Sequence, residues 1–214
     1  SGALRLALFE AVPVSLLMIA LAEPIVALLF QRGRFDHQDT LRAAHVLRFY
    51  GLGMWAFCTH HIILRAFYSL QDQLTPLRIA ASLVAVNFTL NLALIWQPAL
   101  REAAFGLSSA ITSSLAVIIG LALLTRRFGT GLDLPAVFAS LARILLAAIP
   151  AALAAWIADS QILQTLGPAA IGTAGKLARG LLPLTVGVTL YLLLAWLMRM
   201  PELHQLLPRR PSQP

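Results

Sequence analysis

Long apolar stretches constrain the fold of this chain more than any other feature of its sequence. They run over residues 6–30, 41–70, 76–96, 105–124, 136–158 and 176–198. A helix of roughly 20 apolar residues crosses the hydrocarbon core of a bilayer. Hydrophobic residues make up 59% of the chain and charged residues 12%, whereas soluble domains carry about 25% charged residues. The sequence therefore predicts an all-α fold: a polytopic transmembrane bundle of six membrane-spanning helices.

Prolines and polar residues predict where these helices bend and begin. Pro13 and Pro24 lie inside the first stretch, where we expect a kink or an early stop. Asp39 is the predicted N-cap of the second helix, and Thr75 with Pro76 is the predicted start of the third. The second stretch would be about 45 Å long at about 1.5 Å per residue, so it must tilt or project into water.

Two segments are predicted to lie outside the helices. Residues 159–175 are rich in Gly, Thr and Gln, which is typical of a loop. Residues 199–214 carry four prolines and predict a flexible tail. The chain opens without an initiator methionine or a leader, so we expect it to be a piece of a longer protein.

The net charge of +7 does not indicate nucleic-acid binding, because the basic residues lie at the ends of the apolar stretches. With six spans, the side that holds both termini carries 9 of these residues: Arg5, Arg65, Arg78, Arg126, Arg127, Arg143, Arg199, Arg209 and Arg210. The opposite side carries 7: Arg32, Arg34, Arg42, Arg48, Arg101, Lys176 and Arg179. The positive-inside rule then places both termini in the cytoplasm by a small margin. An outward loop with two arginines runs against the usual bias, which indicates a role beyond topology.

The second stretch is polar at both ends and apolar in its middle. Two sets of polar side chains are spaced by three or four residues: Arg42, His45 and Arg48, then His61, Arg65 and Tyr68. At 100° per residue each set forms a stripe, and the two stripes point in different directions. Such a helix suits the wall of a cavity filled with water or lipid headgroups. The alternative, which we weigh equally for Arg42 and Arg65, is that they snorkel to the interfaces.

His60 and His61 lie deeper in the same stretch, and for them we favour a cavity or a helix–helix contact. Gly51 and Gly53 lie between the two stripes, where the helix can bend or a neighbour can approach closely. The candidate substrate or cavity residues are therefore Arg42, His45, Arg48, His61 and Arg65.

Small polar residues predict one more cluster, on the third and fourth helices. Asn87 and Asn91 are four residues apart on the third, and Ser108 and Thr112 have the same spacing on the fourth. Oxygen atoms from two adjacent helices could hold a hard cation such as sodium. The alternative, which we favour, is hydrogen bonding between the helices.

Enzyme chemistry has little support in the sequence. Cys58 and His61 could be half of a metal site, but no second pair with ligand spacing is present. There is no glycine-rich phosphate loop and no Ser-His-Asp set with a reason to converge. We therefore expect a membrane protein that is not an enzyme, without a metal or resident cofactor.

Two motifs resemble a known family. The words EPIVALLFQRGRF, before the second helix, and RAFYSLQDQLTP, at its end, are similar to those of the MurJ (MviN) lipid II flippase family. That family belongs to the MOP group of multidrug, oligosaccharidyl-lipid and polysaccharide exporters. The residues that carry the motif, and that the resemblance marks as a gating loop, are Arg32, Gly33, Arg34, Phe35, Tyr68 and Pro76.

The resemblance implies a fourteen-helix transporter of which this chain is the last six helices. Residues 1–127 would be the second half of the C-terminal six-helix lobe, with four helices. Residues 128–198 would be the two extra helices that form a groove for the lipid tail. Residues 199–214 would be a flexible tail, and the main cavity arginines would lie in the absent part.

The resemblance also implies a function in bacterial cell wall synthesis. Members move lipid II across the inner membrane by alternating access, which implies a multi-pass inner-membrane protein with lipid II and membrane lipids as partners. It would act as a monomer and need its missing N-terminal part. Asn87 matches a sodium-site asparagine of some members, but Asn91 stands where they have an acid, so the coupling ion could be sodium or a proton. Another MOP-type exporter and a non-transporting scaffold remain as alternatives.

Overall fold

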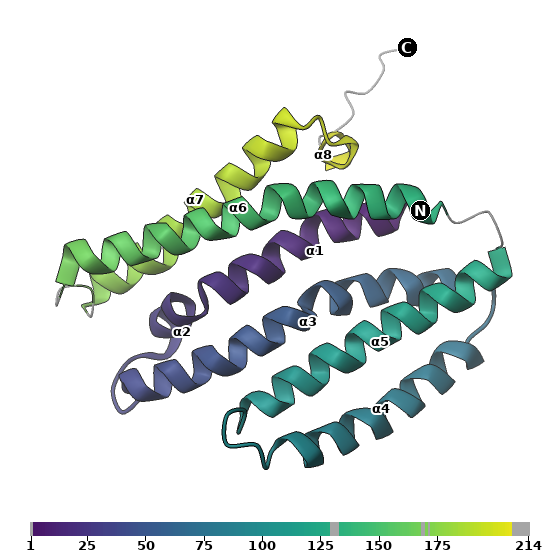
Figure 1. Cartoon of the computed structure of the whole chain (residues 1–214), viewed down its shortest axis with the longest axis horizontal. Helices are drawn as coiled ribbons and strands as arrows, with labels where there is room; N and C mark the ends of the chain where they lie inside the picture. The colour runs from purple at the N-terminus through teal and green to yellow at the C-terminus, as the bar shows by residue number, and fades with distance from the viewer. Residues whose placement is uncertain (1, 129–132, 168–169, 171, 207–214) are drawn as a thin grey trace.

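The computed structural model describes residues 2–128, 133–167, 170 and 172–206, and these form an all-helical bundle (Figure 1). The helices are α1 (Gly2–Ala20), α2 (Ala22–Phe30), α3 (His37–Ser69), α4 (Leu74–Leu94), α5 (Ala103–Phe128), α6 (Leu134–Leu166), α7 (Thr173–Leu197) and α8 (Pro201–Leu206). In the described part of the chain, α1, α4, α5, α6 and α7 are long and apolar enough to cross a membrane. Helix α3 has the length for a sixth span but is more polar.

The predicted break in the first stretch lies at Leu21, between α1 and α2. The backbone bonds continue through it, from Leu21 N to Leu17 O at 2.8 Å and from Ile25 N to Leu21 O at 3.0 Å. Pro24 lies in the first turn of α2, where a backbone N–H has no partner within the helix and its absence costs little. Because proline has no N–H, a backbone carbonyl at the end of α1 is left without its helical hydrogen bond. Pro13 is accommodated inside α1.

The starts of α3 and α4 differ from the prediction. The N-cap of α3 is Asp36, not Asp39: Asp39 N donates to the Asp36 carboxylate at 2.9 Å, and Asp36 N donates to the Asp39 carboxylate at 3.3 Å. This reciprocal capping box satisfies two free amides, which a lone Asp39 cap would not. Helix α4 begins at Leu74, because Asp72 accepts from Thr75 N at 3.0 Å and from Thr75 Oγ1 at 2.7 Å, which places Thr75 in the first turn.

Two segments expected to be irregular are helical. Helix α6 continues to Leu166, so the predicted loop over 159–175 is wrong for its first half. The expected flexible tail is also wrong for residues 201–206, which form α8, and Met200 and Glu202 are buried. Residues 207–214 of that tail lie outside the described residues.

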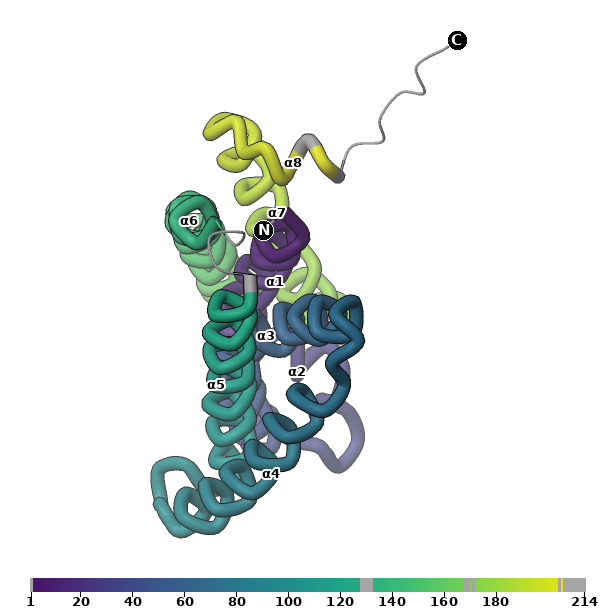
Figure 2. The backbone as a smooth tube through the Cα atoms, turned by 90° about the vertical axis from the view of Figure 1, so that its right-hand side faces the viewer, coloured from purple at the N-terminus to yellow at the C-terminus, as the bar shows by residue number. Residues whose placement is uncertain are grey.

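The helices are arranged around α1 and α3. Helices α1, α3 and α5 lie side by side, the α6–α7 hairpin packs on the other side of α1, and α4 lies at the outer edge against α5 (Figures 1 and 2). Helices α3 and α5 approach closely because Gly53 faces Ala110, where an added Cβ would lie 2.5 Å from the Ala110 Cα. Tyr191 of α7 donates to the Phe9 carbonyl of α1 at 2.7 Å in the core between the hairpin and α1.

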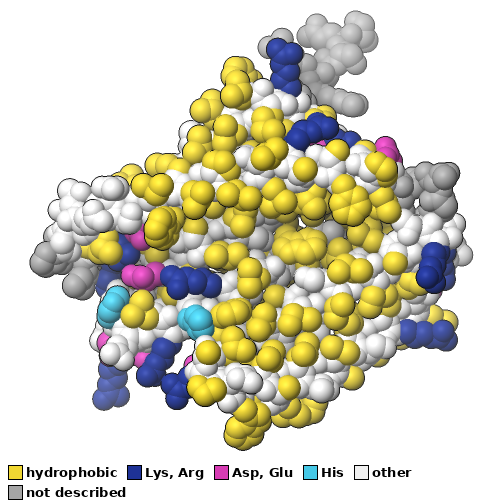
Figure 3. Space-filling view, in the orientation of Figure 1, with side chains coloured by type: hydrophobic (Ala, Val, Ile, Leu, Met, Phe, Trp, Pro, Cys, Tyr) yellow, Lys and Arg dark blue, Asp and Glu magenta, His cyan; other side chains and the backbone are white. Residues whose placement is uncertain are grey.

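The outer surface is apolar along most of the length of the helices. Large hydrophobic side chains cover the face shown in Figure 3, and the charged groups gather toward the two ends of the helices. This is the distribution of a protein whose solvent is lipid in the middle and water at both ends.

Candidate functional site

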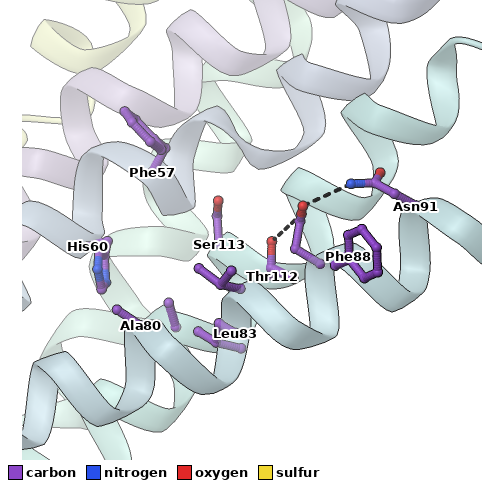
Figure 4. A pocket seen from close by; sticks show the side chains of 11 residues that line it. Phe57, His60, Ala80, Leu83, Phe88, Asn91, Thr112 and Ser113 are labelled. Carbon is purple, nitrogen blue, oxygen red and sulfur yellow. Dashed lines mark hydrogen bonds between the residues drawn. The ribbon is translucent and has the colours of Figure 1, made fainter.

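A cleft of about 420 Å³ opens between α3, α4 and α5. It forms because α4 packs along α5 and touches α3 only briefly. Its wall is apolar with one polar side (Figure 4), and the lining residues are Phe57, His60, Ala80, Leu83, Val84, Asn87, Phe88, Asn91, Thr112, Ser113 and Ala116.

The polar side of the cleft is a closed hydrogen-bond network made by the four predicted cluster residues. Asn91 Nδ2 donates to Asn87 Oδ1 at 2.9 Å, and Asn87 Nδ2 donates to Thr112 Oγ1 at 3.2 Å. Thr112 Oγ1 donates to the Ser108 carbonyl at 2.9 Å, and the Ser108 hydroxyl donates to Asn91 Oδ1. The structure thus brings together all four residues, as their spacing predicts.

This network is electrically neutral, which limits the chemistry it can support. Both amide oxygens already accept a hydrogen bond from within the network. A cation would have to displace those donors and would meet no carboxylate from the residues that line the cleft. The geometry therefore favours a lock between α4 and α5, in which polar contacts hold two membrane helices together.

His60 faces the same cleft from α3. Its Nδ1 is buried and has no hydrogen-bond partner among the described residues. An unpaired buried nitrogen is unfavourable and uncommon in native proteins. The sequence predicts a cavity or a helix–helix contact for His60 and His61, and the structure places His60 in the wall of this cleft.

The predicted cavity residues on α3 do not converge on one site. Arg42 and Arg48 are exposed near the α2–α3 loop, and His45 Nε2 lies 3.3 Å from the Ala99 carbonyl of the α4–α5 turn. His61 and Arg65 are exposed about 24 Å further along the helix at about 1.5 Å per residue. His61 packs edge-on against Phe57, with ring centroids 5.4 Å apart.

The loop motif shapes the turn between α2 and α3. Arg32 Nη2 donates to the Leu29 carbonyl at 2.6 Å. Gly33 has a φ of +61°, a left-handed conformation that favours glycine. Phe35 packs on Phe30, with ring centroids 6.2 Å apart, while the Arg34 side chain is exposed.

The remaining motif residues lie at the other end of α3 and at the start of α4. Tyr68 is exposed. Within α4, which the structure describes over its whole length, Pro76 is the one residue that is buried. Both line a second cleft next to His60.

Two ionic clusters tie the hairpin to α1 and α2, and sequence reasoning missed both. At one end, Arg179 of α7 is buried and pairs with Asp159 of α6 and Glu23 of α2. The Lys176 ammonium also donates to the Gln31 carbonyl at 2.5 Å. The sequence predicts a loop at Asp159, and its partner Arg179 lies 20 residues away, beyond any local pattern.

At the other end, Glu202 of α8 accepts from Ser140 of α6 at 2.7 Å and pairs with Arg5 of α1 at 2.6 Å. Burial alone would raise the pKa of Glu202, but the hydrogen bonds from Ser140 and Arg5 outweigh it and hold the pKa below its ordinary value. The contact also shows that the start of α1 and the end of α7 lie on the same side of the bundle.

Membrane-length apolar helices with charged residues toward their ends are the architecture of a polytopic membrane protein. The sequence profile of the family described as lipid II flippase MurJ matches residues 1–171. The chain therefore belongs to the MurJ family.

Individual relatives agree with this assignment. A probable lipid II flippase MurJ of Rhizobium meliloti (strain 1021) is 31% identical over 163 residues, which cover 76% of this chain and 30% of the relative. One from Thermotoga maritima is 28% identical over 202 residues, covering 94% of this chain and 38% of the relative. The chain thus spans about a third of the length of these relatives.

A solved structure shares the fold. The structure of "Lipid II flippase MurJ, inward closed conformation" superposes with a TM-score of 0.71 at 20% identity, over 92% of this chain and 37% of that chain. The predicted fold class, a transmembrane helical bundle that is part of a MurJ-type transporter, is confirmed, as is a multi-pass location in the membrane.

Proposed function

We propose that this chain is the C-terminal part of a lipid II flippase, which moves the lipid-linked peptidoglycan precursor across the bacterial inner membrane by alternating access. The observation that carries the proposal is the family match over residues 1–171. The chain acts as part of a transporter and not as an enzyme, and its substrate contacts are completed by the rest of the protein.

The two ends of α3 suit contact with an anionic headgroup. Arg42 and Arg48 at one end and Arg65 at the other form no ion pair with the described residues. Their positive charge is therefore available to a pyrophosphate or to lipid headgroups.

The α6–α7 hairpin suits the lipid tail. Its outer faces carry exposed Leu146, Leu153 and Trp156 on α6 and Leu181 and Leu193 on α7. Large apolar side chains at these positions offer the polyprenyl chain a surface as apolar as the membrane core. The division at residue 128 follows the same proposal, with the lobe before it and the hairpin after it.

Orientation and coupling complete the proposal. We assign both ends of this chain to the cytoplasmic side from the distribution of Lys and Arg. Alternating access would be driven by sodium, by a proton or by the membrane potential. The protein would work as a monomer in contact with membrane lipids.

Complementation tests the proposal. The full-length gene is expressed in bacteria depleted of their own flippase, and growth and cell shape are measured. Rescue is expected, and failure of a well-expressed protein to rescue would contradict the proposal. Export of another lipid-linked oligosaccharide or of a drug, without rescue, would support the alternative of a different MOP-type exporter.

A further inference from the structure

We propose that the α6–α7 hairpin has a second task beside the lipid tail: α7 is a splint across the break between α1 and α2, and its Lys176 and Arg179 position the loop motif, residues 32–35. Both are positioning residues, because they act on transport through the loop and not through contact with the substrate. This inference deepens the proposed function and rests on it, since it gives these two residues a part in transport.

Helix α2 depends on its neighbours for its direction. It has nine residues, and a helix that short is marginal on its own. It follows the break at Leu21 and packs on α3, with Ala22 and Val26 against Ala44, and on the start of α7 (Figure 1). Because α2 leads directly into the loop motif, the contacts that fix its direction also fix the position of the loop.

The first end of α2 is held by Arg179. Its Nη2 donates to Glu23 Oε1 at 3.3 Å, in the first turn of α2. Asp159 accepts two further hydrogen bonds from the same guanidinium, at 2.9 and 3.1 Å. Arg179 is 8% exposed, so the positive charge that meets Glu23 is fixed in place and does not follow α2 if that helix moves.

The far end of α2 is held by Lys176. Its ammonium donates to the carbonyl of Gln31, the C-cap residue, at 2.5 Å, and Gln31 directly precedes the loop motif. A cation at this end also meets the negative end of the helix dipole. Arg32 of the motif donates to the Leu29 carbonyl at 2.6 Å. Two cations, one from the loop and one from α7, therefore fix the point at which α2 ends and the motif begins.

Helix α7 is also fixed to α1, on the other side of the break. Pro13 has no N–H, so the Phe9 carbonyl, four residues earlier, lacks its usual helical donor. The Tyr191 hydroxyl donates to that carbonyl at 2.7 Å, and Tyr191 is 5% exposed. One helix thus holds α1 before the break and both ends of α2 after it, which fixes the angle between the two.

Hydrogen exchange tests the splint. Amide exchange is measured by mass spectrometry on the full-length protein in lipid nanodiscs. Lys176→Met removes the contact at the far end of α2, and Glu23→Gln weakens the contact at its first end while it leaves the Arg179–Asp159 pair intact. The controls are Lys176→Arg, which keeps a cationic donor at this position, and Arg126→Met, at an exposed arginine of α5.

Each of the two variants should raise the exchange rate over residues 22–35 about fivefold, as for a segment that loses one local contact, and should leave α5 unchanged. The two controls should exchange like the unaltered protein. An unchanged rate over residues 22–35 in both variants, or an equal rise in α5, would overturn the splint.

Transport tests the positioning role, and it is measured as the lipid II that an external cleaving enzyme reaches in depleted cells. Lys176→Met should lower transport about fivefold, as a residue that couples two sites does, and Lys176→Arg should retain it. In a protein that already carries Arg32→Ala, Lys176→Met should add little, because both changes act through the loop. Normal transport by Lys176→Met, or a second loss of the same size on top of Arg32→Ala, would contradict the positioning role.

The two experiments separate this inference from the flippase proposal. An unaltered, well-expressed protein that exposes no lipid II counts against flippase function and against a part for Lys176 in transport. The exchange pattern is measured without substrate, so it decides the splint in either case.

Discussion

Arg179 on α7 and Asp159 on α6 form a buried two-point ion pair: Nε donates to Oδ1 at 2.9 Å and Nη2 donates to Oδ2 at 3.1 Å. Nη2 also donates to Glu23 Oε1 at 3.3 Å, in the first turn of α2. One guanidinium thus joins three helices and attaches the hairpin to the break between α1 and α2.

Removal of this guanidinium should destabilise the bundle. Arg179→Met leaves Asp159 buried without its partner, and unpairing a buried ion typically costs about 3–5 kcal/mol. Unfolding in mixed detergent micelles measures the change. Arg34→Met, at an exposed arginine, is the control and should be close to neutral. Equal effects of the two substitutions would mean that the buried pair does not hold the hairpin.

Glu202 should make the free energy of unfolding depend on pH at acidic pH values. Its folded pKa lies below the ordinary value of 4.5, so the carboxylate stabilises the fold fully above that value. The contribution is lost as the pH falls through the lower, folded pKa. Thermal unfolding between about pH 7 and 3 should show this loss. Glu202→Gln should lower stability at neutral pH and flatten the acidic limb; an unchanged limb would contradict the Arg5–Glu202–Ser140 contact.

Gly53 should tolerate no side chain. A Cβ there would lie 2.5 Å from the backbone Cα of Ala110, so α3 and α5 would have to separate. Gly53→Ala should therefore lower the unfolding temperature clearly. Gly180→Ala is the matched control, because its Cβ would meet the end of the Leu28 side chain, Cδ2, at 2.6 Å, and that side chain can move aside. A larger effect at Gly180 would contradict the packing described.

The asparagine network should respond to sodium only when it contains an acid. Asn91→Asp places a carboxylate beside Asn87 and Ser108, which gives a monovalent cation a charged ligand. Thermal unfolding in sodium chloride, compared with choline chloride at equal ionic strength, should show a larger sodium-specific shift for Asn91→Asp than for the unaltered protein. An equal shift in both would mean that the neutral network already binds sodium.

The loop motif should matter for transport. Replacing Arg32 and Gly33 with alanine removes the contact to Leu29 and forces a side chain into a left-handed φ. Growth of depleted cells should suffer more than with Arg209→Ala and Arg210→Ala. Equal growth of the two variants would reduce the motif to a folding or topology signal.

Local patterns in the sequence were enough to predict the helices and the network. Apolar stretches located each long helix, because hydropathy acts over neighbouring residues. The four-residue spacing of Asn87 and Asn91, and of Ser108 and Thr112, was enough to predict that these four residues form one cluster. The failures were long-range: Asp159 is tolerated inside α6 because Arg179 lies beside it, and Glu202 is ordered because Arg5, 197 residues away, pairs with it. Such pairs leave no periodic signal in the sequence.

The central claim is tested most directly by the location of lipid II. Cells depleted of their own flippase and expressing the full-length protein are treated from outside with an enzyme that cleaves lipid II and cannot cross the inner membrane. If the protein is a lipid II flippase, the cleaved fraction should return to the level of undepleted cells. Lipid II that accumulates uncleaved on the inner side, with the protein well expressed, would contradict the proposed function.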